Sequence, residues 1–349
     1  MSSPSSVAEH FACDEPVLVG SDRDQPVFVA AAAQRLDAGR LERLERLGGG
    51  LVVLGLDEPI VNQLELPATT QWPRSRLDLA FTPSIDAFRT SGTGWSLADR
   101  ALTMRIAADP STGPSDLTIP GHVHPARLRS DDLLARGDTA SAALELGRLS
   151  GERAAVALSA VTDRDGAFVP LAAARDSGEL SHLPLARCED LRMISRADQA
   201  ARADIVCELP TRAGVFRVLA HVEDATGETT LALVHGDPAG RPAPLVHVHR
   251  ACLFADVFAS LLCPCRALLD RAVAEMVRDG AGICLYSKPA LSTPACGRSR
   301  TVDVAVIAGL LRAAGVNSFR IYEEEGRTVA QLRALGLSVA DNHGLRSAA

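Results

Sequence analysis

The chain has 349 residues, of which 47% are hydrophobic, and a formal net charge of −7. We expect two domains, because a single core seldom serves more than about 250–300 residues. The acidic balance, without any basic run carrying interleaved aromatics, argues against nucleic-acid binding. No apolar run approaches the roughly 18 residues that span a membrane, and the start lacks a secretory pattern. We therefore expect a cytoplasmic protein without membrane contact.

The first half of the chain alternates strand-like and helix-like segments. Apolar runs with strand character flank a charged amphipathic run with helical spacing, which is typical of an α/β start. The segment 90–127 is rich in Gly, Pro, Ser and Thr and is predicted to form loops. The predicted strands cover 16–33, 49–56 and 154–161, and the predicted helices cover 38–48 and 138–151.

The second half continues this alternation after a polar, alanine-rich stretch between Ile194 and Ile205, where we place the domain boundary. The fold class is α/β (α+β), with two domains, 1–198 and 199–349, each a mixed sheet flanked by helices. The predicted strands cover 216–224, 230–237, 244–251, 283–287, 318–324 and 337–341, and the predicted helices cover 266–280, 301–315 and 326–336.

Three cysteines form the one tight group among eight. In HVHRACLFADVFASLLCPC they are Cys252, Cys263 and Cys265. Thiolates are preferred Zn²⁺ ligands, and three protein ligands with an open fourth position are typical of a catalytic zinc. The alternative is that they are small buried apolar side chains.

The fourth zinc position stays open at this stage. Cys296, in TPACGRSR, would close the coordination sphere and make the site structural. His247 or His249 is the other candidate, although a strand histidine more often packs and hydrogen-bonds within the protein.

Two stretches carry a resemblance that extends from about Val7 to about Asn342. CELPTRAGVFRV, LVHGD, PLVHVHRACLFADVFASLLCPC and DGAGICLY resemble GTP cyclohydrolase II. SGTGWSLADRALTMRIAADPSTGPSDLTIPGHVHPARL resembles 3,4-dihydroxy-2-butanone 4-phosphate synthase. The two enzymes occur fused in this order in a bifunctional riboflavin-biosynthesis family, whose members dimerise. The resemblance implies zinc bound by the three cysteines.

The second half departs from that family around the zinc. The family's GTP-contacting glutamate is replaced by Ala251, its glutamine by Leu268 and its nucleophilic arginine by Val302. Its phosphate-binding run is replaced by Glu323, Glu324 and Glu325, whose charges would repel a triphosphate.

The first half departs similarly. The family's acidic Mg²⁺-binding loop has become Ser21–Pro26, its G-H-T-E motif reads Gly137–Ala140, and its later glutamate is Ala160. Mg²⁺ is therefore not expected, although the carboxylate of Asp138 lies in the former motif. The retained candidates for substrate binding are Asp99, Arg100 and His122, with Gly121 beside them.

Three hypotheses follow. The first is a pseudoenzyme, a non-catalytic or regulatory homologue in a flavin-related or specialised-metabolite pathway, which binds a small-molecule metabolite and forms a homodimer or a hetero-oligomer with a paralogue. The second is a repurposed zinc-dependent hydrolase or lyase, with His249, Arg250 or Asp256 assisting a zinc-bound water. The third is residual GTP cyclohydrolase II activity.

Overall fold

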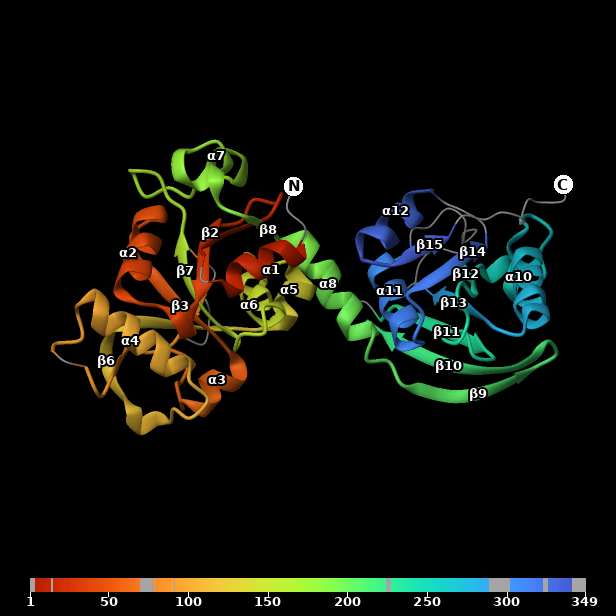
Figure 1. Cartoon of the computed structure of the whole chain (residues 1–349), viewed down its shortest axis with the longest axis horizontal. Coiled ribbons are helices and arrows are strands. Elements are labelled where there is room, and N and C mark those ends of the chain that lie inside the picture. The colour runs from red at the N-terminus through yellow and green to blue at the C-terminus, as the bar shows by residue number, and fades with distance from the viewer. Residues whose placement is uncertain are drawn as a thin grey trace. The chain divides into compact units, whose positions relative to one another are not determined.

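The structure, a computed structural model, describes residues 4–13, 15–69, 77, 79–90, 92–223, 227–288, 302–322 and 326–340. The chain divides into two compact units, unit 1 (Met1–Arg192) and unit 2 (Met193–Ala349), and helix α8 (Cys188–Ala200) runs across the division (Figure 1). The α/β prediction is confirmed. Within the described ranges, no helix is long and apolar enough to cross a membrane.

Unit 1 is built on an eight-stranded mixed sheet with the order β4-β6-β3-β7-β2-β1-β8, in which β5 also pairs with β6. The pairs β1–β8 and β3–β6 are parallel. The strands are β1 (Val17–Gly20), β2 (Phe28–Ala32), β3 (Val52–Asp57), β4 (Ala80–Phe81), β5 (Ile85–Ala87), β6 (Leu117–Leu128), β7 (Ala155–Ala160) and β8 (Leu185–Arg187).

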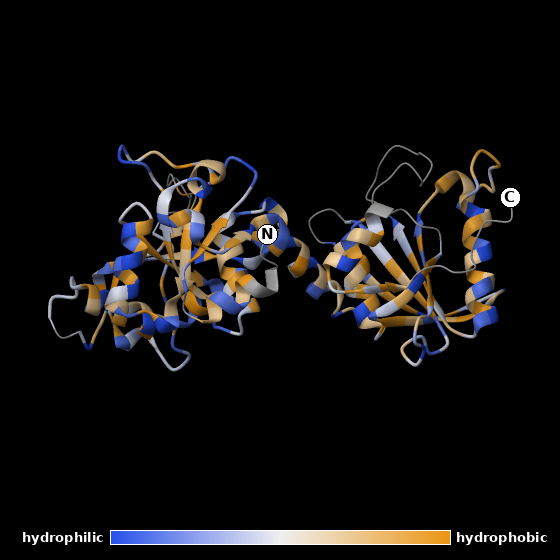
Figure 2. Ribbon diagram, turned by 45° about the horizontal axis from the view of Figure 1, so that its top comes forward, coloured by the Kyte–Doolittle hydropathy of each residue, from blue (hydrophilic) through white to orange (hydrophobic). Residues whose placement is uncertain are grey.

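Helices cover both faces of this sheet because successive strand residues point to opposite sides. Leu54 packs with Leu44 and Met104 of α2 and α4, whereas the adjacent Val53 packs with Leu144 of α6. The apolar colour of Figure 2 accordingly concentrates along the strands. The helices are α1 (Pro4–Ala12), α2 (Ala38–Leu47), α3 (Glu58–Gln63), α4 (Leu97–Ala108), α5 (Ser130–Arg136), α6 (Thr139–Leu149) and α7 (Leu171–Arg175).

Unit 2 contains a seven-stranded mixed sheet with the order β15-β14-β12-β13-β11-β10-β9. Helix α10 packs on one face, with Met276 against Leu245, and α11 and α12 pack on the other. The elements are β9 (Ile205–Thr211), β10 (Gly214–Val222), β11 (Thr229–His235), β12 (Leu245–Arg250), α9 (Leu253–Asp256), α10 (Cys265–Asp279), β13 (Gly282–Lys288), α11 (Val304–Ala313), β14 (Ser318–Tyr322), α12 (Gly326–Ala334) and β15 (Ser338–Ala340).

The prediction of loops over 90–127 is wrong, because this segment contains α4 and the long strand β6. The side chain of Ser96 caps α4 by accepting a hydrogen bond from the backbone N–H of Asp99. The glycine, proline and serine residues of this segment lie mainly before and after α4. The average composition of the segment therefore gives no sign of the helix. Strand β9, which was not predicted either, forms an edge of the second sheet.

Gly121 in β6 lies where no side chain fits. A Cβ there would approach the carbonyl carbon of Ile85 to 2.1 Å and the backbone nitrogen of Asp86 to 2.3 Å. Backbone atoms cannot move away as the end of a side chain can, so the β5–β6 pair depends on this glycine.

We therefore expect Gly121→Ala to destabilise unit 1 by about 1–3 kcal/mol or more, as overpacking does. Urea unfolding followed by circular dichroism measures the change. Gly113→Ala is the control, because a Cβ there meets nothing within 4 Å. Equal stability of both variants would contradict the packing argument.

Candidate functional site

The three cysteines converge at the end of β12. Cys252 follows the strand, and Cys263 and Cys265 lie at the start of α10. Their Sγ atoms all lie within 4.8 Å of one another, with 3.6 Å between Cys252 and Cys263. Tetrahedral zinc with bonds of about 2.3 Å places its sulfur ligands roughly 3.8 Å apart. The thiol geometry therefore fits zinc.

A buried carboxylate supports this cysteine group. Asp256 Oδ2 accepts hydrogen bonds from the backbone N–H of Cys252 and from the hydroxyl of Tyr286, both at 2.9 Å. It also accepts one from Nε2 of His249 at 3.0 Å. Burial, followed by the bond to Asp256, raises the pKa of Tyr286 above its ordinary value. The hydroxyl is thus a donor, and the network fixes both the cysteine loop and the imidazole.

Strand register explains how these side chains meet. His249 of β12 lies opposite Tyr286 of β13, and the rings stack with centroids 5.2 Å apart. His247 lies opposite Tyr322 of β14, and the two imidazoles lie 5.8 Å apart. The parallel strands β12, β13 and β14 thus place four polar rings near their carboxyl ends. Such ends commonly form binding sites in α/β sheets.

Within the part of the chain that the structure describes, His247 has a hydrogen-bond partner for one of its two ring nitrogens. Its Nδ1 lies 3.4 Å from the carbonyl oxygen of Tyr322. A carbonyl only accepts, so Nδ1 carries the proton and Nε2 is an acceptor. This Nε2 is buried and receives no hydrogen bond from a described residue, and burial lowers the pKa of His247 to about 4. The site therefore offers a neutral acceptor to a donor group.

Some of the remaining positions singled out in unit 2 lie within the described residues, and others lie outside them. Arg250 ends β12 and is half-buried, as are Ala251 and Leu268, whereas Val302 packs against the core of unit 2. Cys296 and the run Glu323–Glu325 lie outside the described residues. Among the described residues, the Cys252–Cys263–Cys265 group is the one cluster of three or more His, Cys, Asp or Glu side chains able to hold a metal.

In unit 1 two of the three retained candidates, His122 and Arg100, contact Trp95. His122 meets the indole edge-on at 5.5 Å, and the guanidinium of Arg100 lies 5.9 Å from the ring centroid. Arg100 is also paired with Glu45 at 2.5 Å. Asp99 is buried and accepts a hydrogen bond from Ser96 at 2.8 Å. Arg100 and Asp99 therefore both have roles in holding α4.

His122 is held by a carboxylate that the sequence analysis missed. Asp86 accepts from the backbone N–H of His122 at 3.0 Å and contacts its Nδ1 at 2.8 Å. The imidazole is about one-third exposed, whereas Asp86 is buried. This pairing fixes the imidazole through Nδ1, as in an acid–base dyad. Asp86 lies on β5, so only the β5–β6 pairing reveals it.

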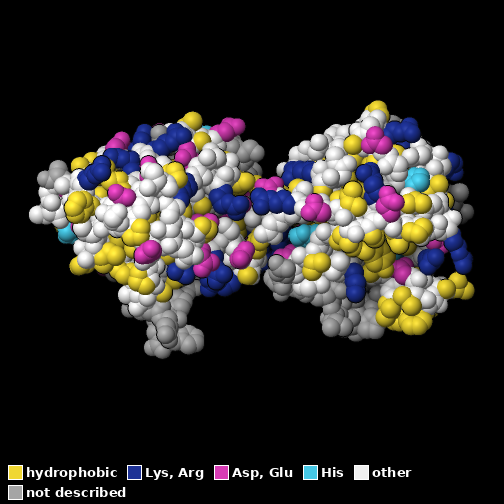
Figure 3. Space-filling model, turned by 90° about the horizontal axis from the view of Figure 1, so that it is seen from below, with side chains coloured by type: hydrophobic (Ala, Val, Ile, Leu, Met, Phe, Trp, Pro, Cys, Tyr) yellow, Lys and Arg dark blue, Asp and Glu magenta, His cyan; other side chains and the backbone are white. Residues whose placement is uncertain are grey.

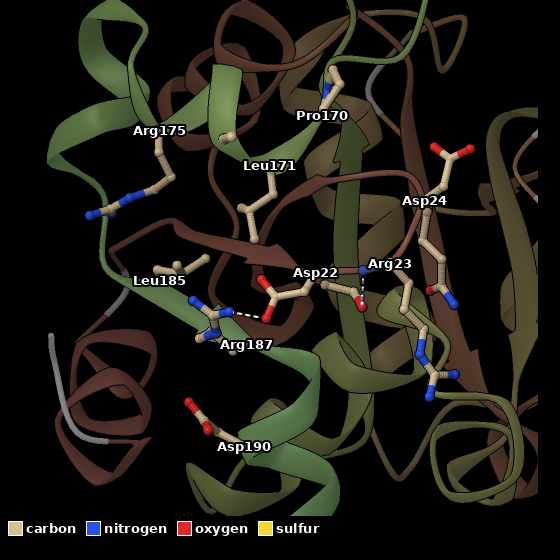
Figure 4. A pocket seen from close by; sticks show the side chains of 12 residues that line it. Asp22, Arg23, Asp24, Pro170, Leu171, Arg175, Leu185, Arg187 and Asp190 are labelled. Atoms are coloured by element: carbon tan, nitrogen blue, oxygen red, sulfur yellow. Dashed lines mark hydrogen bonds and ion pairs between the residues drawn. The ribbon is translucent and has the colours of Figure 1, made fainter.

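Unit 1 also contains a pocket of about 700 Å³ beside the loop after β1 (Figure 4). Asp22 and Arg187 form an ion pair within it, with Leu171 and Leu185 nearby. Burial raises the pKa of Asp190. The lining comprises Ser21, Asp22, Arg23, Asp24, Gln25, Pro170, Leu171, Ala172, Arg175, Leu185, Arg187 and Asp190. The sequence analysis identified Ser21–Pro26 only as the altered counterpart of the family's Mg²⁺-binding loop, and it did not single out the residues from Pro170 onward.

The carboxylate left in the former G-H-T-E motif has a structural role. Asp138 caps α6 by accepting from the backbone N–H of Ser141 at 2.7 Å and from its hydroxyl at 2.5 Å. Asp22, in the former acidic loop, is likewise engaged within the protein, by its ion pair with Arg187.

Comparisons with known proteins agree on one family. Residues 5–194 match the family model for 3,4-dihydroxy-2-butanone 4-phosphate synthase, and residues 202–293 match that for GTP cyclohydrolase II. The riboflavin biosynthesis protein RibBA of Salinispora arenicola is 32% identical over 93% of this chain and 84% of its own length. RibBA of Mycobacterium tuberculosis is 32% identical over 78% of this chain and 66% of its own length.

A solved structure shares the fold. It is RibBX, described as a two-domain 3,4-dihydroxy-2-butanone 4-phosphate synthase from A. baumannii. The TM-score is 0.62 at 21% identity, covering 98% of this chain and all of that one. The two-domain architecture is therefore common to both proteins.

We expect Asp256→Asn to raise the zinc dissociation constant by about 10–100-fold, the usual effect of losing a group that orients metal ligands. Competition with a chromophoric chelator at fixed pH measures it. Asp270→Asn is the control, because Asp270 is exposed and pairs only with its helix neighbour Arg266 among the bonds seen here. Unchanged affinity in the Asp256 variant would exclude this positioning role.

The buried His247 should make stability pH-dependent. With a folded pKa of about 4 against an ordinary 6.5, the unfolded chain binds more protons between these values. Stability is therefore complete above pH 6.5 and falls as the pH drops toward 4, by on the order of 3 kcal/mol.

Denaturant unfolding across this pH range tests it, with chelator present because metal binding to thiolates is itself pH-dependent. His247→Gln should flatten the profile, whereas His182→Gln, at an exposed position, should not. An unaltered profile in His247→Gln would show that another group is responsible.

Proposed function

Because the chain belongs to the riboflavin-biosynthesis family that joins 3,4-dihydroxy-2-butanone 4-phosphate synthase to GTP cyclohydrolase II, we propose that it is a zinc-binding member with neither activity. It acts as a non-catalytic or regulatory protein of a flavin-related or specialised-metabolite pathway. The observation that carries the proposal is an intact thiol group beside Ala251 and Leu268, which replace residues that contact GTP in the family.

Zinc binding is supported by the distances between the thiols and by a hydrogen bond that holds one of the cysteines in place. The three thiols have the separations of zinc ligands, and Asp256 fixes the backbone of Cys252. Bound zinc would hold the two ends of the 253–262 loop together and, with an open fourth position, would supply Lewis acidity.

Loss of the GTP reaction is supported by the substituted positions. Ala251, Leu268 and Val302 carry no group that can donate to a nucleotide, accept a proton or attack phosphorus. His247 stands where the family has an arginine, and it offers a neutral acceptor rather than a cation. A ligand of this site would therefore have an N–H or O–H donor rather than a triphosphate.

Loss of the synthase reaction is supported in unit 1. Asp138 serves as a helix cap, and Ala160 replaces the family's glutamate, so a base and a Mg²⁺ ligand are missing from their expected positions. The pocket at Ser21–Gln25 is lined by three arginines and three aspartates, of which Arg187 and Asp22 pair with each other. We assign to it a small-molecule metabolite whose carboxylate or phosphate Arg23 and Arg175 would bind.

A second candidate function is favoured by the His249–Asp256–Tyr286 network. Here a carboxylate accepts hydrogen bonds from an imidazole and a phenol beside three candidate zinc ligands, as the groups that orient the ligands of a catalytic zinc do. In this alternative the protein is a zinc-dependent hydrolase or lyase acting on a different small substrate, and Arg250 lies at the end of the same strand.

We expect the purified chain to contain about one zinc per chain by elemental analysis, and Cys263→Ser to lose most of it. The zinc-loaded protein should consume neither GTP nor ribulose 5-phosphate, and chromatography of the reaction mixtures measures this. An authentic bifunctional enzyme, assayed in parallel, is the positive control. A regulatory role further requires that the chain alter the rate of that enzyme on mixing.

Each outcome separates the hypotheses. Formation of the pyrimidine product from GTP would restore the family activity and refute the main proposal. Turnover of another amide or ring substrate that disappears in Cys263→Ser would select the hydrolase alternative. A zinc-free chain with undisturbed folding would refute both.

A further inference from the structure

The thiols of Cys252 and Cys263 are close enough to react with each other. Their Sγ atoms lie 3.6 Å apart at the two ends of the loop formed by residues 253–262. A disulfide bond is about 2.05 Å long, so the two sulfurs need to approach each other by roughly 1.5 Å. The pair is therefore within reach of disulfide formation.

The loop is held in its shape by hydrogen bonds that involve no sulfur. The backbone N–H of Asp256 donates to the carbonyl of Cys252 at 2.7 Å, and Asp256 Oδ2 accepts from the backbone N–H of Cys252 at 2.9 Å. Further along, the backbone N–H of Ser260 donates to the carbonyl of Phe254 at 2.9 Å. The backbone N–H of Leu262 donates to the hydroxyl of Ser260 at 3.3 Å. These bonds do not depend on a metal, so the two thiols stay near each other in the metal-free chain.

Solvent reaches one residue of the pair more readily than the other. Cys252 is fully buried, whereas Cys263 is half-buried. The two residues before Cys263 are open to solvent, since Leu261 is 99% exposed and Leu262 89%. Figure 3 shows exposed hydrophobic side chains in a group at the lower margin of unit 2. A small oxidant in solution therefore meets Cys263 before Cys252.

The third thiol cannot hold zinc without the other two. Cys265 is buried at the start of α10, in a cluster with Cys252 and Ala255. Zinc is bound by thiolates, and the sulfurs of a disulfide are no longer thiolates. A disulfide between Cys252 and Cys263 leaves Cys265 as one thiolate of the three. Oxidation of the pair and zinc binding therefore exclude each other.

We propose that Cys252 and Cys263 form a dithiol site that a hydroperoxide oxidises to a disulfide, and that zinc leaves the site when this bond forms. The thiolate of Cys263 attacks one peroxide oxygen. An S–O bond forms, the O–O bond breaks and hydroxide leaves. The thiolate of Cys252 then attacks the sulfur of this sulfenic acid, so that the S–S bond forms, the S–O bond breaks and a second hydroxide leaves. The two sulfurs lose two electrons, which the peroxide gains, and protons from solvent convert both hydroxides to water.

The inference rests on the proposed function for the zinc alone. It gives a regulatory protein without turnover two chemical states, one reduced and zinc-bound and the other oxidised and zinc-free. Disulfide formation is also measurable in the metal-free chain. A chain that binds no zinc but forms the disulfide would support the dithiol site and contradict the proposed zinc binding, so the two failures can be told apart.

Treatment of the zinc-loaded full chain with hydrogen peroxide, in the presence of a chromophoric zinc chelator, tests the inference. The starting protein is Cys13→Ser/Cys207→Ser, which removes two exposed cysteines outside the group. It should release about one zinc per chain and lose about two thiols, counted with a thiol reagent. Dithiothreitol should then restore both the thiols and zinc binding, because a disulfide is reversibly reduced.

Peptide mapping of the metal-free chain identifies the sulfurs that react. No Lys or Arg lies between Cys252 and Arg266, so trypsin leaves all three thiols on one peptide. A second cleavage before Asp256 separates Cys252 from the other two, and the disulfide should keep the fragments joined until it is reduced. Cys265→Ser should still form this bond, whereas Cys263→Ser should not. Circular dichroism verifies that both variants are folded.

Three results would overturn the inference. The first is zinc that stays bound while peroxide oxidises other thiols of the chain. The second is a disulfide that joins Cys252 or Cys263 to a different cysteine. The third is oxidation that dithiothreitol does not reverse, because it would mean that Cys263 passes to a sulfinic acid before Cys252 can reach it.

Discussion

The carboxylate of Asp256 is the constraint on which the functional end of unit 2 depends. A charge removed from water is tolerated only when hydrogen bonds replace its hydration. Asp256 receives bonds from the backbone of Cys252, from Tyr286 and from His249, which belong to the cysteine loop, β13 and β12. Breaking any of them would leave a buried charge poorly compensated. These hydrogen bonds hold the three segments in one arrangement, which in turn positions the thiols.

The two units make different use of inherited motif positions. In unit 1, Asp138 caps a helix and Arg100 forms an ion pair. Both side chains therefore have a role in folding that needs no ligand. In unit 2, the thiols of Cys252, Cys263 and Cys265 converge in a small cluster of their own, together with Ala255. Asp138 and Arg100 thus have contacts that serve the fold, whereas the three thiols have the separations of zinc ligands.

The sequence predicts what depends on local pattern. The alternating elements from Leu245 onward and the convergence of three cysteines follow from periodicity and spacing. Helix α4 and strand β6 escaped prediction because the composition of 90–127 is averaged over turns, a capped helix and a strand. Asp86, Tyr286 and Tyr322 escaped it for another reason. Their roles arise from pairing between strands distant in sequence, and register cannot be read from either strand alone.

The close approach at Gly121 bears on how such a protein changes over time. Because a Cβ there would collide with the backbone of β5, every descendant that keeps this strand pair must keep the glycine, whether or not it catalyses anything. Its presence beside His122 in a recognisable motif is therefore uninformative about activity. A sequence motif can persist after its reaction is lost when contacts with the backbone, rather than with a substrate, exclude other residues at that position.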